Sequence, residues 1–169
     1  MRVLGIDQAM DNKCGFAVVD DQGVVYTYME TYKGIKHGCT RQRCYRFGAV
    51  LQTIYNTYKP DAVVTEMVRA FHQGQVNKHT ISALSQLQGV INVVIPQPVP
   101  VYIVNTGSWQ AQMLAPKRTG IDVKTLSAMY VQDKYGLDVP HHVSDAINMA
   151  LYLQLMENQL RRHVLELVS

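Results

Sequence analysis

The chain has 169 residues, a length that fits one domain with a sizeable hydrophobic core. Its hydrophobic content of 47% argues against a disordered chain, and no apolar run approaches the ~20 residues of a membrane span. The three cysteines are sparse and odd in number, which argues against a disulfide scaffold and for a reducing compartment. We therefore expect a cytoplasmic protein without a signal peptide or a membrane segment.

The formal net charge of +3 hides an uneven distribution along the sequence. Residues 1–30 have a net charge of −3, residues 31–121 of +8 and residues 122–169 of −2. A cationic central segment of this kind suits a polyanion such as nucleic acid. A solvated basic surface would give the same count, so charge alone leaves both interpretations open.

The first part of the chain is rich in strand patterns. Short apolar runs predict strands at residues 2–6, 15–19 and 24–30, and residues 20–23 form a good hairpin turn between the last two. Three such runs in succession predict three strands paired antiparallel.

Helical and strand patterns alternate in the remainder. An apolar face from Phe47 to Tyr58 predicts a helix that ends before Pro60. Asp122 and Gly136 are the candidate N-cap and stop of a later helix. The other predicted elements are a strand at 61–66, a helix at about 75–94, a strand at 101–104, a helix at about 122–135 and a last helix from 142–144 to beyond 160.

This order predicts an α/β protein with a mixed five-stranded sheet. Three antiparallel strands are followed by β-α-β alternation, which places helices on both faces of the sheet. That topology is typical of the ribonuclease H-like fold. We expect residues 1–169 to form a single domain of this kind.

Two acids stand directly after apolar strands. Asp7 follows residues 3–6, and Glu66 follows residues 62–65. Because the first and fourth strands of such a sheet can be neighbours, both carboxylates would emerge at adjacent strand ends, where ligands bind. Two close carboxylates repel each other and favour a cation, and oxygen ligands suit Mg²⁺ or Mn²⁺. Either acid could also simply terminate its strand.

A second pair of candidate ligands stands at the start of the last helix. His142 and Asp145 are three residues apart and share one helix face, and the helix N-terminus favours the Asp145 carboxylate. Apolar residues that follow would pack this helix on the sheet and hold the pair against Asp7 and Glu66. Taken alone, the two residues could be an ordinary capping pair. The four residues together predict a metal site.

The chain resembles the RuvC family of Holliday-junction resolvases, and its divergent phage-encoded members most of all. The resemblance rests on Gly-Ile-Asp at 5–7 with Gly-Phe-Ala-Val at 15–18, Thr65-Glu66, residues 84–89, and His142-x-x-Asp145-Ala146. Gln8-Ala9 stands where the family has Pro-Gly. Arg69 occupies the place of the family's aromatic wedge, and Phe71 is the nearest aromatic residue.

The resemblance implies Mg²⁺-dependent hydrolysis of DNA phosphodiesters, with Mn²⁺ as a substitute, to 5′-phosphate and 3′-hydroxyl ends. Asp7 would anchor two ions, Glu66 would bind one and Asp145 the other. His142 would be a ligand or a base near the attacking water, and its spacing fits the motif better than that of His141. A homodimer would nick a four-way junction symmetrically, in the host cytoplasm if the protein is phage-encoded.

Basic and aromatic residues, nearly all from the central segment, are the candidates for DNA contact. They are Lys33, Lys36, Arg41, Arg43, Arg46, Arg69, Phe71, Lys78, Lys117, Arg118 and Lys124. Two other functions remain open: a general branched-DNA endonuclease with weak junction preference, and a catalytically silent nucleic-acid-binding module. A sugar-kinase or actin-like ATPase would need two such lobes, and this chain supplies one.

Overall fold

A computed structural model describes residues 1–9, 13–35, 40–68, 78–114 and 120–168, with side chains up to residue 161. Its elements in chain order are β1 (Val3–Asp7), β2 (Lys13–Asp20), β3 (Gly23–Thr31), α1 (Thr40–Tyr58), β4 (Ala62–Glu66), α2 (Lys78–Val94), β5 (Val101–Val104), α3 (Thr106–Met113), α4 (Val123–Tyr135) and α5 (His141–Val168). The strands form one sheet in the order β3-β2-β1-β4-β5. The β1–β2 and β2–β3 pairs are antiparallel, whereas β1–β4 and β4–β5 are parallel. The predicted mixed five-stranded sheet is therefore confirmed.

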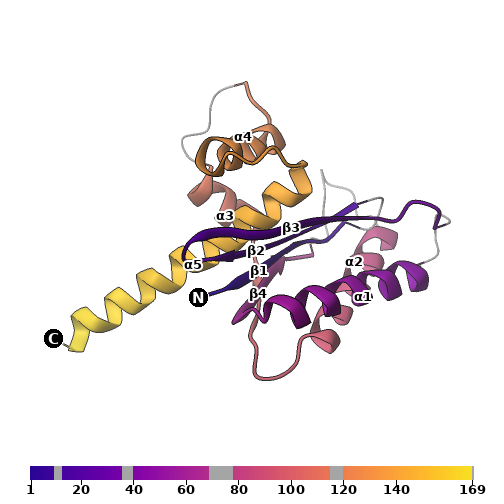
Figure 1. Ribbon diagram of the computed structural model, residues 1–169, viewed down its shortest axis with the longest axis horizontal. Helices are drawn as coiled ribbons and strands as arrows, with labels where there is room; N and C mark the ends of the chain where they lie inside the picture. The colour runs from indigo at the N-terminus through magenta and orange to yellow at the C-terminus, as the bar shows by residue number, and fades with distance from the viewer. Residues whose placement is uncertain (10–12, 36–39, 69–77, 115–119, 169) are drawn as a thin grey trace.

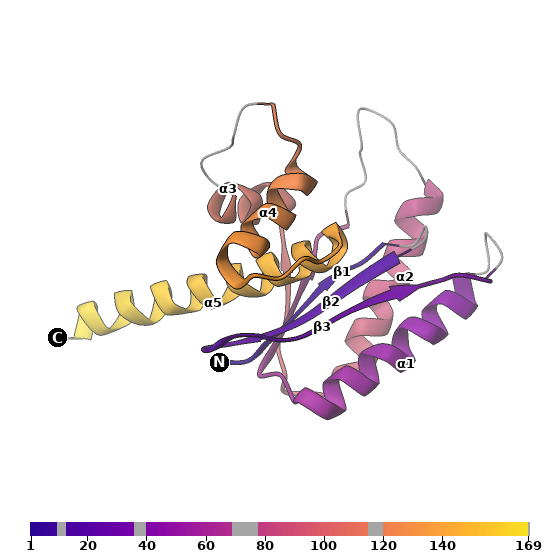
Figure 2. The same ribbon diagram turned by 45° about the horizontal axis from the view of Figure 1, so that its top comes forward.

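Alternation along the central strands divides the core into two layers. Val3 faces a cluster that includes side chains of α3, α4 and α5. Leu4 and Ile6 face a second cluster, built with Phe47 of α1 and Leu87 of α2. Figures 1 and 2 show α1 and α2 on one face of the sheet and α3, α4 and α5 on the other, with α5 running on past the strands.

Helix α5 lies unusually close to the sheet where two glycines face it. A Cβ atom at Gly15 would lie 2.0 Å from the carbonyl oxygen of His142, and one at Gly5 would lie 2.0 Å from that of Ala146. Real Cβ atoms do not approach backbone this closely, so any side chain at these positions would push α5 away. The two glycines therefore set the distance between α5 and β1–β2.

Most predicted elements match the structure, and the caps of α4 match in detail. Asp122 accepts hydrogen bonds from the backbone of Lys124 and Thr125, and Gly136 adopts the left-handed conformation at φ 68°. Helix α3 was not predicted. It begins after Asn105, whose side chain accepts a hydrogen bond from the Gly107 amide. The N-terminal residues of the predicted helix at 75–94 lie outside the described residues.

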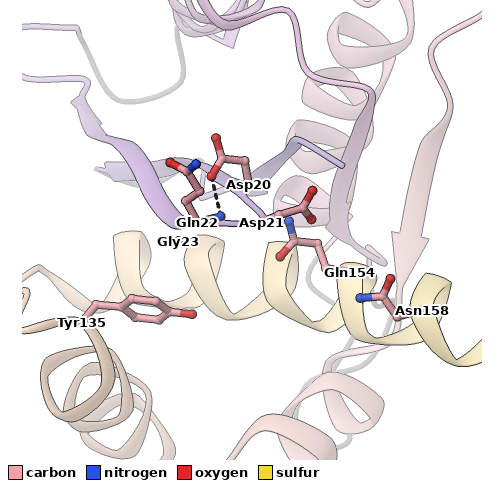
Figure 3. A pocket seen from close by; sticks show the side chains of 7 residues that line it. All are labelled: Asp20, Asp21, Gln22, Gly23, Tyr135, Gln154 and Asn158. Carbon is pink, nitrogen blue, oxygen red and sulfur yellow. Dashed lines mark hydrogen bonds between the residues drawn. The ribbon is translucent and has the colours of Figure 1, made fainter.

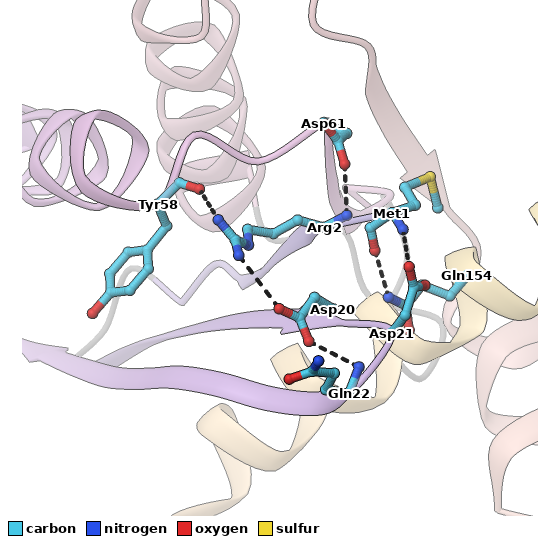
Figure 4. Close-up of polar contacts among 8 residues, drawn as sticks. All are labelled: Met1, Arg2, Asp20, Asp21, Gln22, Tyr58, Asp61 and Gln154. Carbon is cyan, nitrogen blue, oxygen red and sulfur yellow. Dashed lines mark hydrogen bonds and ion pairs between the residues drawn. The ribbon is translucent and has the colours of Figure 1, made fainter.

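Polar contacts fix the end of the sheet at which β1 begins (Figure 4). The amino group of Met1 pairs with Asp21 at 2.6 Å. The Arg2 guanidinium donates to the Tyr58 carbonyl at 2.9 Å, and the Arg2 amide donates to Asp61 at 2.7 Å. These contacts join β1 to the β2–β3 turn and to the end of α1. Within the part of the chain that is described, no helix is both long and apolar enough to cross a membrane.

The close approach of α5 predicts a selective cost of enlarging Gly15. Gly15→Ala should lower the free energy of unfolding by about 1–3 kcal/mol, because its Cβ would meet the backbone of α5. Gly89→Ala in α2 is the control, since a Cβ there meets nothing within 4 Å and should raise helix stability by ~0.5–1 kcal/mol. Urea denaturation measures both. A Gly15→Ala protein as stable as the wild type would contradict the close packing.

Candidate active site

The carboxylates of Asp7 and Glu66 lie at one edge of the sheet. Strands β1 and β4 are parallel, and Ile6 lies opposite Thr65, so the next residue of each strand is one of the two acids. Alternation directs both side chains to the face covered by α3, α4 and α5. The predicted juxtaposition of the two strand ends is thus present.

Helix α5 brings His142 directly onto Asp7. The Nδ1 atom of His142 lies 2.6 Å from Oδ2 of Asp7, and both side chains are less than one-fifth exposed. The preceding His141 ring packs against that of His142, with the ring centroids 3.9 Å apart. Burial, followed by the charge of His142, lowers the pKa of His141. Of the two histidines considered from the sequence, His142 is the one in contact with Asp7.

Trp109 holds the Glu66 carboxylate. Its indole Nε1 donates a hydrogen bond of 2.7 Å to Oε1 of Glu66. The ring of Trp109 is fully buried in the cluster between α3 and α5. The bond to Glu66 was missed because α3 was not predicted. Asn105, a good N-cap residue before Thr106, was the local signal for that helix.

A buried polar network from α4 holds Asp145. The Ser127 hydroxyl donates to Oδ1 of Asp145, and Ser127 lies 3.1 Å from the Ser144 hydroxyl. Asn148 donates to the Ser127 hydroxyl at 2.9 Å. Burial first, and then the negative charge of Asp7, raises the pKa of Asp145 to about 7; Glu66 adds to this effect, whereas Ser127 and His142 oppose it.

These contacts bear on the metal site that the sequence predicts. Carboxylate oxygens and an imidazole suit a hard divalent cation, and such a cation would neutralise the negative charges that, after burial, raise the pKa of Asp145. However, no group of three or more His, Cys, Asp or Glu side chains among the described residues is placed to hold a metal ion. Donor chemistry therefore fits a cation, while the side chains as placed do not form a complete ligand set.

The candidate DNA-contact residues differ in how exposed they are and in what they contact. Arg46 pairs with the buried Glu30 at 2.7 Å and is about half exposed. Arg43 departs from its predicted role, because it is 6% exposed and its guanidinium lies over the Tyr32 ring. Exposed members of the set are Lys33, Arg41, Lys78 and Lys124. The members that lie outside the described residues are Lys36, Arg69, Phe71, Lys117 and Arg118.

A cleft of about 470 Å³ lies at the other end of β1, beside the β2–β3 turn (Figure 3). Its lining includes Asp20, Asp21, Tyr135 and Gln154. Val19 pairs with Val3 and Gly15 with Asp7, so this cleft is separated from the carboxylates by the length of the strand. It contains none of the residues predicted to act on a substrate.

The raised pKa of Asp145 predicts how the stability of the metal-free protein depends on pH. The folded state holds the Asp145 proton up to about pH 7. The unfolded chain releases it near about pH 4, so the folded state binds the proton more tightly. Between these values the free energy of unfolding should fall as pH rises, by at most about 1.4 kcal/mol per pH unit. Urea denaturation in a chelating buffer measures the slope.

Asp145→Asn removes this titration and keeps an oxygen that accepts from Ser127. The variant should be more stable than the wild type at pH 8 and about equally stable at pH 4. Asp133→Asn, at an exposed position of α4, is the control and should follow the wild type at both pH values. Equal stability of wild type and Asp145→Asn at pH 8 would show that Asp145 carries no buried charge.

Comparison with known proteins finds no matching family model and no matching curated protein. Solved structures do match. T. thermophilus RuvC in complex with a Holliday junction substrate has a TM-score of 0.71 at 22% identity, over 90% of this chain and 91% of that chain. Another Thermus thermophilus RuvC structure gives 0.64 at 23% identity, over 90% and 92%. The yeast mitochondrial Holliday junction resolvase Ydc2 gives 0.61 at 14% identity, over 95% and 80%. The chain thus has the ribonuclease H-like fold of RuvC.

Proposed function

We propose that the chain is a metal-dependent endonuclease that nicks four-way DNA junctions, with residues 1–169 forming one nuclease domain. The observation that carries the proposal is the contact of His142 with Asp7 at 2.6 Å, made where β1 ends and α5 begins. It brings together two of the four residues that the sequence motifs predict. The remaining two residues are Glu66 and Asp145. After burial, the negative charges of Asp7 and Glu66 raise the pKa of Asp145, which places all three acids near one another.

In this proposal Asp7, Glu66, Asp145 and His142 would hold Mg²⁺ or Mn²⁺. Bound ions would supply an activated water and neutralise charge on the scissile phosphate, and the products would carry 5′-phosphate and 3′-hydroxyl ends. Trp109 and Ser127 orient the carboxylates of Glu66 and Asp145 through their hydrogen bonds. When His142 donates its Nδ1 proton to Asp7, its Nε2 atom stays available for a proton or a metal.

The outward side of α1 fits the backbone of a DNA arm. Residues 31–60 contain six Lys and Arg and no acidic residue. Arg41 and Tyr45 lie one turn apart on α1, and the Tyr45 ring is 79% exposed. Arg46 is about half exposed and pairs with Glu30. An exposed aromatic ring among cations suits a nucleic-acid strand, since the cations bind phosphate and the ring can stack on an unpaired base. Tyr45 was not among the residues singled out in the sequence.

A homodimer is the assembly that this function favours. A four-way junction has two-fold symmetry, so two opposed nicks need two sites related by a two-fold axis. Helix α2 presents Val93, which is 84% exposed, beside the buried Ile91. We propose that α2 pairs with the same helix of a second copy.

Cleavage of defined DNA substrates tests the proposed activity. A labelled four-way junction, a fork and a linear duplex are incubated with the protein, with and without Mg²⁺. The junction should be nicked only with Mg²⁺, and Asp7→Asn should abolish the reaction because it removes a carboxylate from the site. Asp133→Asn, at an exposed position of α4, should leave cleavage unchanged.

The same assay separates the other two functions. Equal cleavage of fork and junction would favour a general branched-DNA endonuclease. Binding of the junction without cleavage of any substrate in Mg²⁺ or Mn²⁺ would favour a catalytically silent module.

The α1 surface predicts a change in the salt dependence of binding. Arg41→Gln should weaken junction binding at every sequence and reduce the slope of log K against log[salt] by about one, because one phosphate contact is lost. Lys59→Gln, beyond the other end of α1, should leave the slope unchanged. Fluorescence anisotropy in a chelating buffer measures both. An equal slope for wild type and Arg41→Gln would show that Arg41 of α1 does not contact the DNA backbone.

A further inference from the structure

The side chain of Gln8 joins three elements beside the candidate active site. Its Nε2 atom lies 2.8 Å from the Thr65 hydroxyl oxygen, 3.3 Å from the Glu66 carbonyl oxygen and 2.8 Å from Oε1 of Gln88. Gln8 directly follows Asp7, the last residue of β1, and Gln88 lies within α2. The contacts therefore connect the ends of β1 and β4 to a helix on the opposite face of the sheet from α5.

The chemistry of the acceptors fixes the orientation of the Gln8 amide. A backbone carbonyl only accepts hydrogen bonds, so the NH₂ group of Gln8 must face Glu66. In that orientation the same NH₂ group meets Thr65 and Oε1 of Gln88. Gln88 thus holds the Gln8 amide in the position from which it binds β4.

These bonds begin where the backbone pairing ends. The register of β1 and β4 runs from Val3 opposite Ala62 to Ile6 opposite Thr65. Beyond this point the Gln8 side chain joins the two strands, since it donates hydrogen bonds to Thr65 and Glu66, the last two residues of β4. The Gln8 side chain therefore adds a link between the ends of β1 and β4 just beyond their last paired residues, and this link also contacts Gln88.

The arrangement carries a cost that stability alone does not explain. Oε1 of Gln8 and Nε2 of Gln88 are both buried, and neither has a hydrogen-bond partner within the described parts of the chain. A buried polar atom without a partner destabilises a fold, and an apolar side chain of similar shape is often neutral or favourable instead. Buried polar atoms of this kind call for an explanation, and both side chains lie beside the candidate site.

We propose that Gln8 and Gln88 are positioning residues that hold Asp7 and Glu66 at the spacing needed for metal binding and cleavage. The inference rests on the proposed function. It concerns a part of the chain that differs from the resembled family, because Gln8 stands in place of proline.

Gln88→Met tests this by keeping the size of the side chain and removing the acceptor. Its urea midpoint should equal or exceed that of the wild type, because the unpaired Nε2 atom is removed too. Cleavage of a bound junction should slow at least tenfold with unchanged DNA affinity, and the Mg²⁺ concentration for half-maximal thermal stabilisation should rise at least threefold. Gln132→Met, at an exposed position of α4, is the matched control.

A double variant with Gln8→Met makes the test sharper. Because the two residues act through one bond, Gln8→Met with Gln88→Met should be no slower than Gln8→Met alone. Gln88→Glu keeps the acceptor oxygen and should recover part of the cleavage rate. Multiplicative losses in the double variant, or wild-type cleavage and metal dependence in Gln88→Met, would overturn the inference.

The metal titration separates this inference from the proposed function. If the wild-type protein cleaves no DNA, the proposed function fails, while the Mg²⁺-dependent thermal shift of Gln88→Met still reports on positioning. An unchanged shift in that variant would reject the positioning role by itself.

Discussion

The whole site depends on how closely α5 can lie on the sheet. Gly5 and Gly15 leave no atom between the strands and the backbone at Ala146 and His142. That contact determines where the first turn of α5 sits, and so places His142 beside Asp7. The α5 side chains on this surface are also small, since Ala146 and Ala150 are fully buried there. A feature of packing, the lack of a side chain at two strand positions, thus decides the polar geometry of the site.

Each carboxylate of the site has a hydrogen-bond donor of its own. Asp7 contacts His142, Glu66 accepts from Trp109 and Asp145 accepts from Ser127. Such donors reduce the repulsion among three nearby acids, so the fold can keep them together without a cation. Burial first, and then the charge of Asp7, still raises the pKa of Asp145. Protein contacts thus hold the three acids of the candidate site close together.

The fold could be predicted because its signals are local or topological, and the same signals pointed to the strand-end acids. Apolar runs gave the strands, and Asp122 and Gly136 marked the ends of α4. The donors to Glu66 and Asp145 are different, since Trp109 and Ser127 acquire their roles only when α3 and α4 pack over the sheet. No spacing in the sequence brings those residues to the acids.

Arg43 is a case in which the sequence did contain the answer. Continuing the apolar face of α1 backward from Leu51 and Phe47 by four residues reaches Arg43, which is buried. Its neighbour Arg46 falls outside that face and is half exposed. The signal was the helical period rather than the charge. For Gln8 and Gln88, 80 residues apart, no such local pattern existed.

The contact between Asp7 and His142 joins residues 135 positions apart, the first strand and the last helix. During synthesis on the ribosome, β1, β2 and β3 can pair long before α5 has left the exit tunnel. Asp7 therefore lies on the sheet early, and Glu66 joins it with β4, whereas His142 and Asp145 reach them only after α5 has been made. A nascent chain that ends before α5 therefore lacks His142 and Asp145, two of the four residues of the candidate site.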